Sequence, residues 1–322
     1  MFAVTAARLT PDQPLTGLEL GQRPEPVAPE GWTTVALKAV SLNHHDLWTL
    51  RGIGVHVDRL PIILGSDGAG VDEDGNEVII YPVINDPAWR GDETVDPHRC
   101  LLSEQYDGTL AERVAVPRRN LAPKPPSLSW EQAACLPTAW LTAYRMLFTF
   151  SGLRPGDTVL VPGAGGGVAT ALIILGNAAG YRVWVTSRDE VKRTRARELG
   201  AEQVFPTGAR LPERVDAVME TVGAATWSHS VRAVKPGGAI VVSGATSGAN
   251  PPAELTHIFF RQLRVIGVTM GTRDELARLV RFCEITGARP VIDTVLPLPQ
   301  ARDGFARMLS GQQFGKIVFR IA

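Results

Sequence analysis

The stretch DTVLVPGAGGGVATALIILGNAAGYRVWVTSR, residues 157–188, decides the fold of this 322-residue chain. An apolar strand is expected over 157–162, a small-residue helix over 167–179, and a second strand over 182–186. Between the first strand and the helix lies a glycine cluster, which lets the backbone turn sharply and approach a diphosphate, while the helix start presents free N–H groups. This order predicts a dinucleotide site, the alternative being a tight turn without a ligand, at Gly163, Ala164, Gly165, Gly166, Gly167 and Val168.

The end of the second strand bears on the choice of dinucleotide. NAD enzymes usually carry an acid there, which accepts a hydrogen bond from the ribose 2′-hydroxyl. Here the strand ends in Ser187 and Arg188, and Lys192 follows one helical turn later. These side chains would bind and neutralise a 2′-phosphate, so the sequence predicts NADP. The alternative is that Arg188 and Lys192 form a solvated helix face.

The rest of the chain separates into regions with different expected secondary structure. After residue 150, strands expected at 203–205, 215–219, 239–243 and 264–270 alternate with helical segments, which predicts a doubly wound parallel sheet. A further helix is expected over 273–286. Residues 1–125 are expected to be all-β, and Ser129 with Gln132 predicts a capped helix start. The tail returns to β character over 291–295 and 316–321, where it could pair with the N-terminal region.

Composition restricts the class of protein. The 33 basic and 33 acidic residues cancel, which argues against nucleic acid or a charged membrane as the main partner. The three cysteines are too scattered for a disulfide framework. The start of the chain lacks signal-peptide character, and no apolar run reaches the length of a membrane span. We therefore expect a cytoplasmic protein that acts on a small molecule.

The order of motifs resembles the medium-chain dehydrogenase/reductase superfamily over nearly the whole chain. The resemblance implies a GroES-like β-barrel domain, 1–125 completed by 273–322, beside a Rossmann NADP-binding domain, 126–272, with the active site in the cleft between them. The segments that carry it are SLNHHDLWTLRG (41–52), LGSDGAG (64–70), YDGTLAERVAVP (106–117), LPTAWLTAYRML (136–147), VPGAGGGVAT (161–170), VKPGGAIVVSGA (234–245) and FGKIVF (314–319).

The sequence departs from the zinc members of this family at the metal positions. The first ligand position is Asn43, the His-Glu position reads Ser66-Asp67, and the third falls near Thr138. Asn and Thr are poor ligands for a catalytic zinc. The loop that carries structural zinc in relatives is replaced by 85–105. The chain thus resembles the zinc-independent, quinone oxidoreductase-like branch and is expected to hold no metal, although metal clusters remain alternatives at His44, His45, Asp46 and Asp67 and at His98 with Cys100.

Without a metal to polarise it, the substrate must be electrophilic enough to accept a hydride. Quinones and α,β-unsaturated carbonyls qualify because the negative charge moves onto a distant oxygen. The expected reaction is hydride transfer from NADPH followed by protonation from a side chain or water. Asn43 is the expected donor to the substrate oxygen, and His45 the expected proton-transfer residue. Asp46 resembles the family's fixed acid, which orients the site or pairs with a base; packing or capping is the plainer alternative for each.

Further cofactor contacts follow from the sheet and from the resemblance. Ligands bind beyond the carboxyl ends of parallel strands, which selects Ser243, Gly244, Ala245 and Thr246. The next strand is expected to end at Met270, Gly271 and Thr272, which are expected to flank the nicotinamide. The resemblance adds Thr142, Phe314, Gly315 and Lys316, and His44 is expected to face the cofactor phosphates.

Three points concern partners and competing functions. Family members commonly pair the strand expected at 264–270 across a dimer, so a homodimer is expected. A zinc-type alcohol or aldehyde dehydrogenase with unusual ligands remains a second enzymatic reading. A non-enzymatic NADPH-binding sensor is the alternative of a different class.

Overall fold

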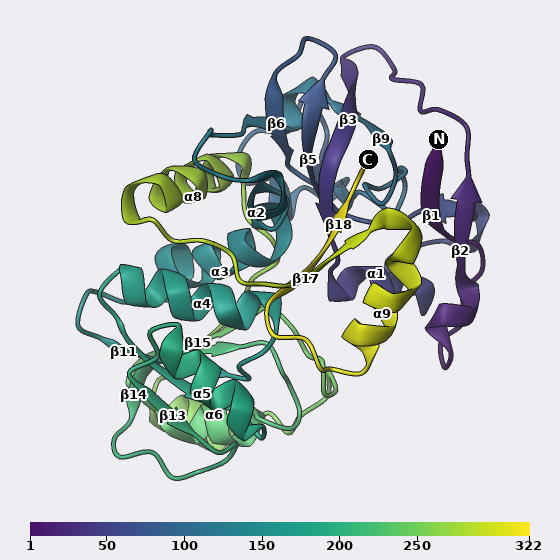
Figure 1. Ribbon diagram of the computed structural model, residues 1–322. Helices are drawn as coiled ribbons and strands as arrows, with labels where there is room; N and C mark the ends of the chain where they lie inside the picture. The colour runs from purple at the N-terminus through teal and green to yellow at the C-terminus, as the bar shows by residue number, and fades with distance from the viewer. The chain divides into compact units, whose positions relative to one another are not determined.

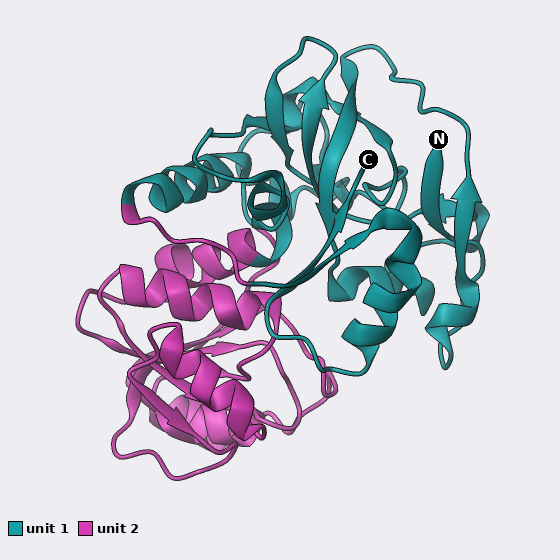
Figure 2. Cartoon of the chain, viewed as in Figure 1, with its two compact units in different colours: residues 1–139, 271–285, 292–322 teal, residues 140–270, 286–291 magenta.

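The computed structural model describes all 322 residues, and their contacts divide them into two compact units (Figure 2). The first unit combines Met1–Ala139, Gly271–Ile285 and Ile292–Ala322. The second combines Trp140–Met270 and Thr286–Val291. The first unit continues past residue 125 because the short helix α2, Trp130–Ala133, packs against strands of that unit.

Two sheets build most of the first unit (Figure 1). A three-stranded sheet has the order β2-β1-β4, and a seven-stranded sheet the order β10-β6-β5-β3-β18-β17 with β9 paired to β3. A two-stranded ladder joins β7 to β8. The strands are β1 Phe2–Ala6, β2 Leu18–Gln22, β3 Trp32–Ser41, β4 Ile62–Ile63, β5 Asp67–Asp72, β6 Glu77–Ile80, β7 Val83–Ile84, β8 Cys100–Leu101, β9 Arg113–Pro117, β10 Leu121–Pro123, β17 Ile292–Pro297 and β18 Lys316–Arg320.

The last strand of the chain returns to the N-terminal sheet. β18 pairs antiparallel with β3, so that Val318 lies opposite Ser41 and Arg320 opposite Ala39. β17 lies parallel to β18 on its other side. This register brings Lys316, at the start of β18, to the end of β3, where Leu42 and Asn43 follow.

The first unit also contains helices that frame its site. They are α1 His44–Leu50, α2, most of α8 Arg273–Thr286, and α9 Ala301–Leu309. The all-β expectation for residues 1–125 was wrong at α1. The run HHDLWTL has no strand alternation, and Asp46, at the third helical position, accepts the backbone N–H of Asn43 at 2.8 Å and so stabilises a helix start.

The second unit holds six parallel strands in the order β13-β12-β11-β14-β15-β16 (Figure 1). This is the doubly wound parallel sheet expected from the sequence: β12 and β13 lie on one side of β11, and β14, β15 and β16 lie on the other. Right-handed crossovers then place α4 and α5 on one face and α6 and α7 on the other. The strands are β11 Thr158–Pro162, β12 Arg182–Thr186, β13 Gln203–Phe205, β14 Val215–Glu220, β15 Val234–Val242 and β16 Arg264–Gly267; the helices are α3 Leu141–Arg145, α4 Gly167–Ala178, α5 Glu190–Glu198, α6 Trp227–Ala233 and α7 Leu255–Phe260.

Local chemistry explains where these elements begin and end. The central strand β11 is buried along its whole length, as a parallel strand covered on both faces must be. The predicted capping box at α2 is confirmed. The Ser129 hydroxyl accepts the backbone N–H of Gln132 at 3.2 Å, and the side-chain oxygen of Gln132 accepts the backbone N–H of Ser129 at 3.1 Å. β16 ends at Gly267, earlier than expected, and Met270 has a left-handed φ of 52°. No helix combines the length and the apolar character needed to cross a bilayer.

Candidate active site

The start of α1 fixes Asn43 and Asp46. Asn43 is extended and precedes the helix, and its backbone N–H is held by Oδ2 of Asp46. Oδ1 of Asp46 accepts the N–H of Gly65 at 2.9 Å. Burial raises the pKa of this carboxyl. Both oxygens of Asp46 accept from the backbone, so the side chain ties α1 to the turn before β5 and positions Asn43.

A buried ion pair lies beside Asn43. Nζ of Lys316 lies 3.1 Å from Oδ2 of Asp67, and the two side chains are 3% and 0% exposed. The ammonium also donates to the carbonyl of Leu42 at 2.8 Å and to Oδ1 of Asn43 at 2.5 Å. The same carboxylate oxygen accepts from the Ser41 hydroxyl at 2.8 Å. All three protons of the ammonium therefore have acceptors, as a buried charge requires.

Lys316 determines how the Asn43 amide is turned. An ammonium has only donors, so the amide atom beside it is the acceptor Oδ1. Nδ2 then points to Ser66, whose hydroxyl oxygen lies 3.4 Å away. Nδ2 carries two N–H groups, and at most one of them is used in this long contact. The other is available to an oxygen atom of a bound molecule.

The three positions that carry zinc ligands in relatives meet here without ligands of the right chemistry. The hydroxyls of Ser66 and Thr138 lie 3.2 Å apart, next to the Asn43 amide. Thr138 donates to Asp67 at 2.5 Å. Zinc prefers thiolate, imidazole or carboxylate ligands, whereas this set offers neutral groups, and the Lys316 ammonium would repel a cation. No group of three or more His, Cys, Asp or Glu side chains is arranged to hold a metal ion anywhere in the structure.

His44 and His45 are neighbours on α1 but have different surroundings. His44 makes no hydrogen bond, and its pKa is lowered by burial and by the charges of Lys316 and Arg51. Nε2 of His45 lies 3.0 Å from Oε1 of Glu104. Nδ1 of His45 is buried and has no partner.

In the second unit, the glycine turn presents unpaired backbone donors. Gly163 ends β11 with a left-handed φ of 83°, which favours glycine, and its N–H donates to the carbonyl of Thr186 at 2.8 Å. Gly166 is the residue before α4, and no side chain caps that helix. The first N–H groups of a helix have no partner within it. The turn Gly163–Val168 therefore fits the diphosphate of a dinucleotide.

The residues that follow β12 include an exposed cation and a helix-capping acid. Arg188 is exposed and makes no ion pair or hydrogen bond in the structure. Asp189 is the residue before α5, where its carboxylate accepts the backbone N–H of Lys192 at 3.1 Å. Ser187 is held in turn, because its hydroxyl accepts the N–H of Asp189 at 3.2 Å and its carbonyl accepts from Arg193 at 2.7 Å. The nearby acid thus caps a helix, and a cation is left open to solvent.

The residues after β15 lie at the same sheet edge, because β15 pairs in parallel with β14. Ser243 donates to the sulfur of Met146 at 3.1 Å, and Thr246 makes only a long contact to the carbonyl of Thr221, at 3.5 Å. There is little room for a side chain at Gly244, since a Cβ there would lie 3.0 Å from the carbonyl oxygen of Thr221. Ala245 completes this turn.

The remaining predicted cofactor residues are spread over both units. Thr142 lies buried on α3, and Met270 is buried after β16. Thr272 caps α8 together with Glu275, through hydrogen bonds of 3.1 and 2.8 Å. Gly271 lies between β16 and α8, and its carbonyl accepts from the Tyr81 hydroxyl at 2.8 Å. Phe314 and Gly315 precede β18; Phe314 is buried and Gly315 has a φ of 107°.

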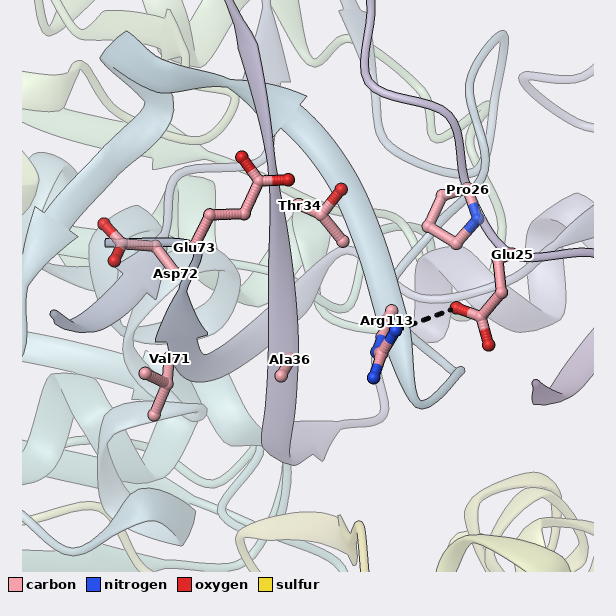
Figure 3. Close-up of a pocket in the computed structure, with 8 residues that line it drawn as sticks. All are labelled: Glu25, Pro26, Thr34, Ala36, Val71, Asp72, Glu73 and Arg113. Atoms are coloured by element: carbon pink, nitrogen blue, oxygen red, sulfur yellow. Dashed lines mark hydrogen bonds and ion pairs between the residues drawn. The ribbon is translucent and has the colours of Figure 1, made fainter. Parts of the chain in front are cut away.

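A surface depression elsewhere on the first unit contains none of these side chains. Figure 3 shows Arg113 turned toward Glu25 on its rim, with 3.5 Å between the nearest nitrogen and oxygen. The depression is lined by Glu25, Pro26, Thr34, Ala36, Val71, Asp72, Glu73 and Arg113. We do not place the substrate there.

Comparisons with known proteins decide the family. The family model described as alcohol dehydrogenase GroES-like domain matches residues 29–126, and that described as zinc-binding dehydrogenase matches residues 167–284. A crystal structure of an NAD-dependent alcohol dehydrogenase superposes with a TM-score of 0.92 at 34% identity, over 100% of both chains. The chain belongs to the medium-chain dehydrogenase/reductase superfamily. As such it is an oxidoreductase that uses a nicotinamide cofactor.

Two curated relatives show the range of this superfamily. The zinc-type alcohol dehydrogenase-like protein C1773.06c of Schizosaccharomyces pombe is 29% identical over 90% of this chain and 91% of its own length. Crotonyl-CoA carboxylase/reductase of Cereibacter sphaeroides is 30% identical over 72% of this chain and 67% of its own length. Zinc-type proteins and reductases of unsaturated thioesters are thus both among the relatives of this medium-chain dehydrogenase/reductase.

Two contacts of the site were not predicted from the sequence. The resemblance predicts Lys316 beside the cofactor but not its pairing with Asp67. A signal was present, because a lysine opens the otherwise apolar run 316–319 after a glycine. Glu104 lies in the loop that replaces the structural zinc loop, and nothing in its local sequence indicates a histidine partner.

Proposed function

We propose that this medium-chain dehydrogenase/reductase reduces an α,β-unsaturated carbonyl compound or a quinone with NADPH, without a catalytic metal. The observation that carries the proposal is the Asn43 amide. Its Oδ1 accepts from a buried ammonium at 2.5 Å, which polarises the amide and turns Nδ2–H toward a substrate oxygen. A preorganised donor of this kind stabilises the negative charge that develops on a conjugated oxygen.

The residues at the zinc positions limit the chemistry that can be supported. A saturated aldehyde or an alcohol needs a strong Lewis acid or a base at its oxygen. Asn43, Ser66 and Thr138 are neutral donors and do not fit a zinc ion, so we route no step through one. A conjugated acceptor needs less stabilisation at its oxygen, because the negative charge that develops on hydride transfer is delocalised.

The cofactor supplies a hydride when it is bound at the glycine turn. The chain's own part is to hold the diphosphate on the N–H groups at the start of α4 and the 2′-phosphate on Arg188, Ser187 and Lys192. The uncommitted guanidinium of Arg188 supports NADPH over NADH. One neighbour of known structure is named as an NAD-dependent alcohol dehydrogenase, so the preference is tested with both cofactors.

Among the relatives, the crotonyl-CoA carboxylase/reductase supports a conjugated acceptor, since a crotonyl thioester is an α,β-unsaturated carbonyl compound. In such a substrate the hydride adds to the β-carbon, the carbonyl oxygen takes the charge, and a proton then restores the carbonyl. Asn43 Nδ2 donates to that oxygen throughout.

An acceptor panel tests the proposal. Purified protein is mixed with NADPH or NADH and with enones, enals, unsaturated thioesters, quinones and saturated aldehydes, and cofactor absorbance is followed. We expect turnover of conjugated acceptors with NADPH preferred. Reduction of saturated aldehydes that depends on added zinc would favour the zinc-type hypothesis, and NADPH binding without any turnover would favour the sensor.

Asn43→Asp separates the two enzymatic readings. The variant keeps an oxygen for Lys316 but replaces the amide N–H donor by a second acceptor. We expect kcat/KM to fall by about 10²- to 10³-fold, the usual effect of removing such a donor. Under the zinc-type reading the added carboxylate would instead improve metal binding and activity.

A further inference from the structure

Glu104 reaches α1 from a distant turn of the first unit. Its Oε1 lies 3.0 Å from Nε2 of His45, and the two side chains are 20% and 13% exposed. Its other oxygen accepts the backbone N–H of Leu101 at 2.7 Å, so the carboxylate cannot swing away without losing that bond. The contact joins residues 59 positions apart.

The turn that presents Glu104 is tightly constrained. Ser103 has a left-handed φ of 73°, which is unfavourable for a residue with a side chain, and its buried hydroxyl has no partner. The N–H of Glu104 donates to the carbonyl of Leu101 at 3.2 Å and closes the turn. Gly54 leaves space for the carboxylate, because a Cβ there would lie 3.1 Å from Oε1.

The second nitrogen of His45 is the unusual feature. Nδ1 is buried and has no hydrogen-bond partner in the protein. An unpaired buried polar atom costs about 1–3 kcal/mol, which is tolerated where a ligand completes the hydrogen bond. With Nε2 held by Glu104, Nδ1 is the only nitrogen of this ring that can serve a bound molecule.

We propose that Glu104 is a positioning residue that holds the His45 imidazole through Nε2, so that Nδ1–H delivers the proton that completes the reduction. The inference rests on the proposed function and specifies its proton donor. After the hydride has added to the substrate, the Nδ1–H bond breaks and its proton goes to the resulting enolate. The imidazole is left neutral, with Nε2–H still on Glu104, and takes a new proton from water.

The electrostatics of the pair agree with this assignment. Burial lowers the pKa of His45, but the hydrogen bond to Glu104 and the charges of Asp46, Glu104 and Asp67 outweigh burial, so the pKa lies above its usual value. A raised pKa extends the range in which both ring nitrogens carry a proton to higher pH than for an ordinary histidine. As pH rises through that pKa, the donor is lost, so activity should fall on the alkaline side.

The test compares Glu104→Gln and Glu104→Asp with the wild type. Glu104→Gln keeps the shape but removes the charge, and we expect the alkaline limb of the kcat/KM profile to move to lower pH and activity at neutral pH to fall about 10²-fold. NMR titration of the His45 ring, assigned by its loss in His45→Asn, should show the same downward shift without substrate. Glu104→Asp keeps the charge, so its kcat/KM profile and its His45 titration should both lie closer to those of the wild type than in Glu104→Gln.

Glu73→Gln is the matched control, since this half-exposed acid lies in the depression of Figure 3 and should change neither readout. An unchanged profile and an unchanged His45 titration in Glu104→Gln, in a protein that does turn over conjugated acceptors, would overturn the inference and leave the proposed function standing. A wild type with no turnover of any acceptor would overturn the proposed function, and the inference with it.

Discussion

Removing the buried ammonium of Lys316 should damage both stability and catalysis. In Lys316→Met the Asp67 carboxylate stays buried and loses its counter-ion at 3.1 Å, and Asn43 loses the donor that holds its Oδ1. Breaking a buried pair on one side costs about 3–5 kcal/mol. Asp67 keeps its hydrogen bonds from Ser41 and Thr138, so we expect the lower end, about 3 kcal/mol.

A double-mutant cycle isolates this interaction. Asp67→Asn alone leaves an ammonium without a counter-ion, whereas Asp67→Asn with Lys316→Met leaves no buried charge. We expect the double variant to lose clearly less stability than the sum of the single variants, with a coupling above about 1 kcal/mol. The measurement is urea unfolding followed by tryptophan fluorescence.

The catalytic consequence is read from NADPH oxidation with the best acceptor of the panel. The freed Asn43 amide should lower kcat/KM about 10²-fold in Lys316→Met, even under conditions where the variant is folded. Additive effects in the cycle, or a Lys316→Met protein within about 0.5 kcal/mol of the wild type and fully active, would refute the reasoning.

Three further predictions concern the cofactor, the metal and the assembly. Arg188→Glu places a negative charge beside the 2′-phosphate, so kcat/KM with NADPH should fall at least about tenfold while that with NADH changes little, as steady-state kinetics with both cofactors would show; parallel losses would argue against the assignment. Dialysis against a chelator should leave enone reduction unchanged and added zinc should not increase it, with elemental analysis as the control; loss and recovery of activity would count against a metal-free site. β16 ends its sheet with Val265 at 45% exposure, so we expect a dimer through this edge, and Val265→Glu should give a monomer by light scattering, whereas a monomeric wild type would contradict the expectation.

The second unit was largely predictable from the sequence. The bounds expected for β12 and β13 are those observed, and those for α4 and β14 differ by about one residue. These elements follow one another along the chain, so local periodicity and the glycine turn between β11 and α4 suffice. The helix α1 was missed because Asp46 supports its start through buried contacts, and a helix of seven residues has little periodicity to detect.

The candidate site was predictable only in part, because its partners are distant in the sequence. Asn43 could be selected by its place in a motif, but the orientation of its amide depends on Lys316, 273 residues away. The pairing of Asp67 with Lys316 depends on β18 returning to β3, which no local pattern contains. The Glu104–His45 contact likewise arises from a turn in an irregular loop.

The most direct test of the metal-free hydride transfer is isotopic. Protein shown by elemental analysis to hold no stoichiometric metal is incubated with an enone and NADPH carrying deuterium at the transferable position of the nicotinamide, and the product is examined by NMR. We predict deuterium at the β-carbon, at a rate unaffected by chelator and strongly reduced in Asn43→Asp. Deuterium transfer only after zinc is restored, or at an undiminished rate in Asn43→Asp, would contradict the account.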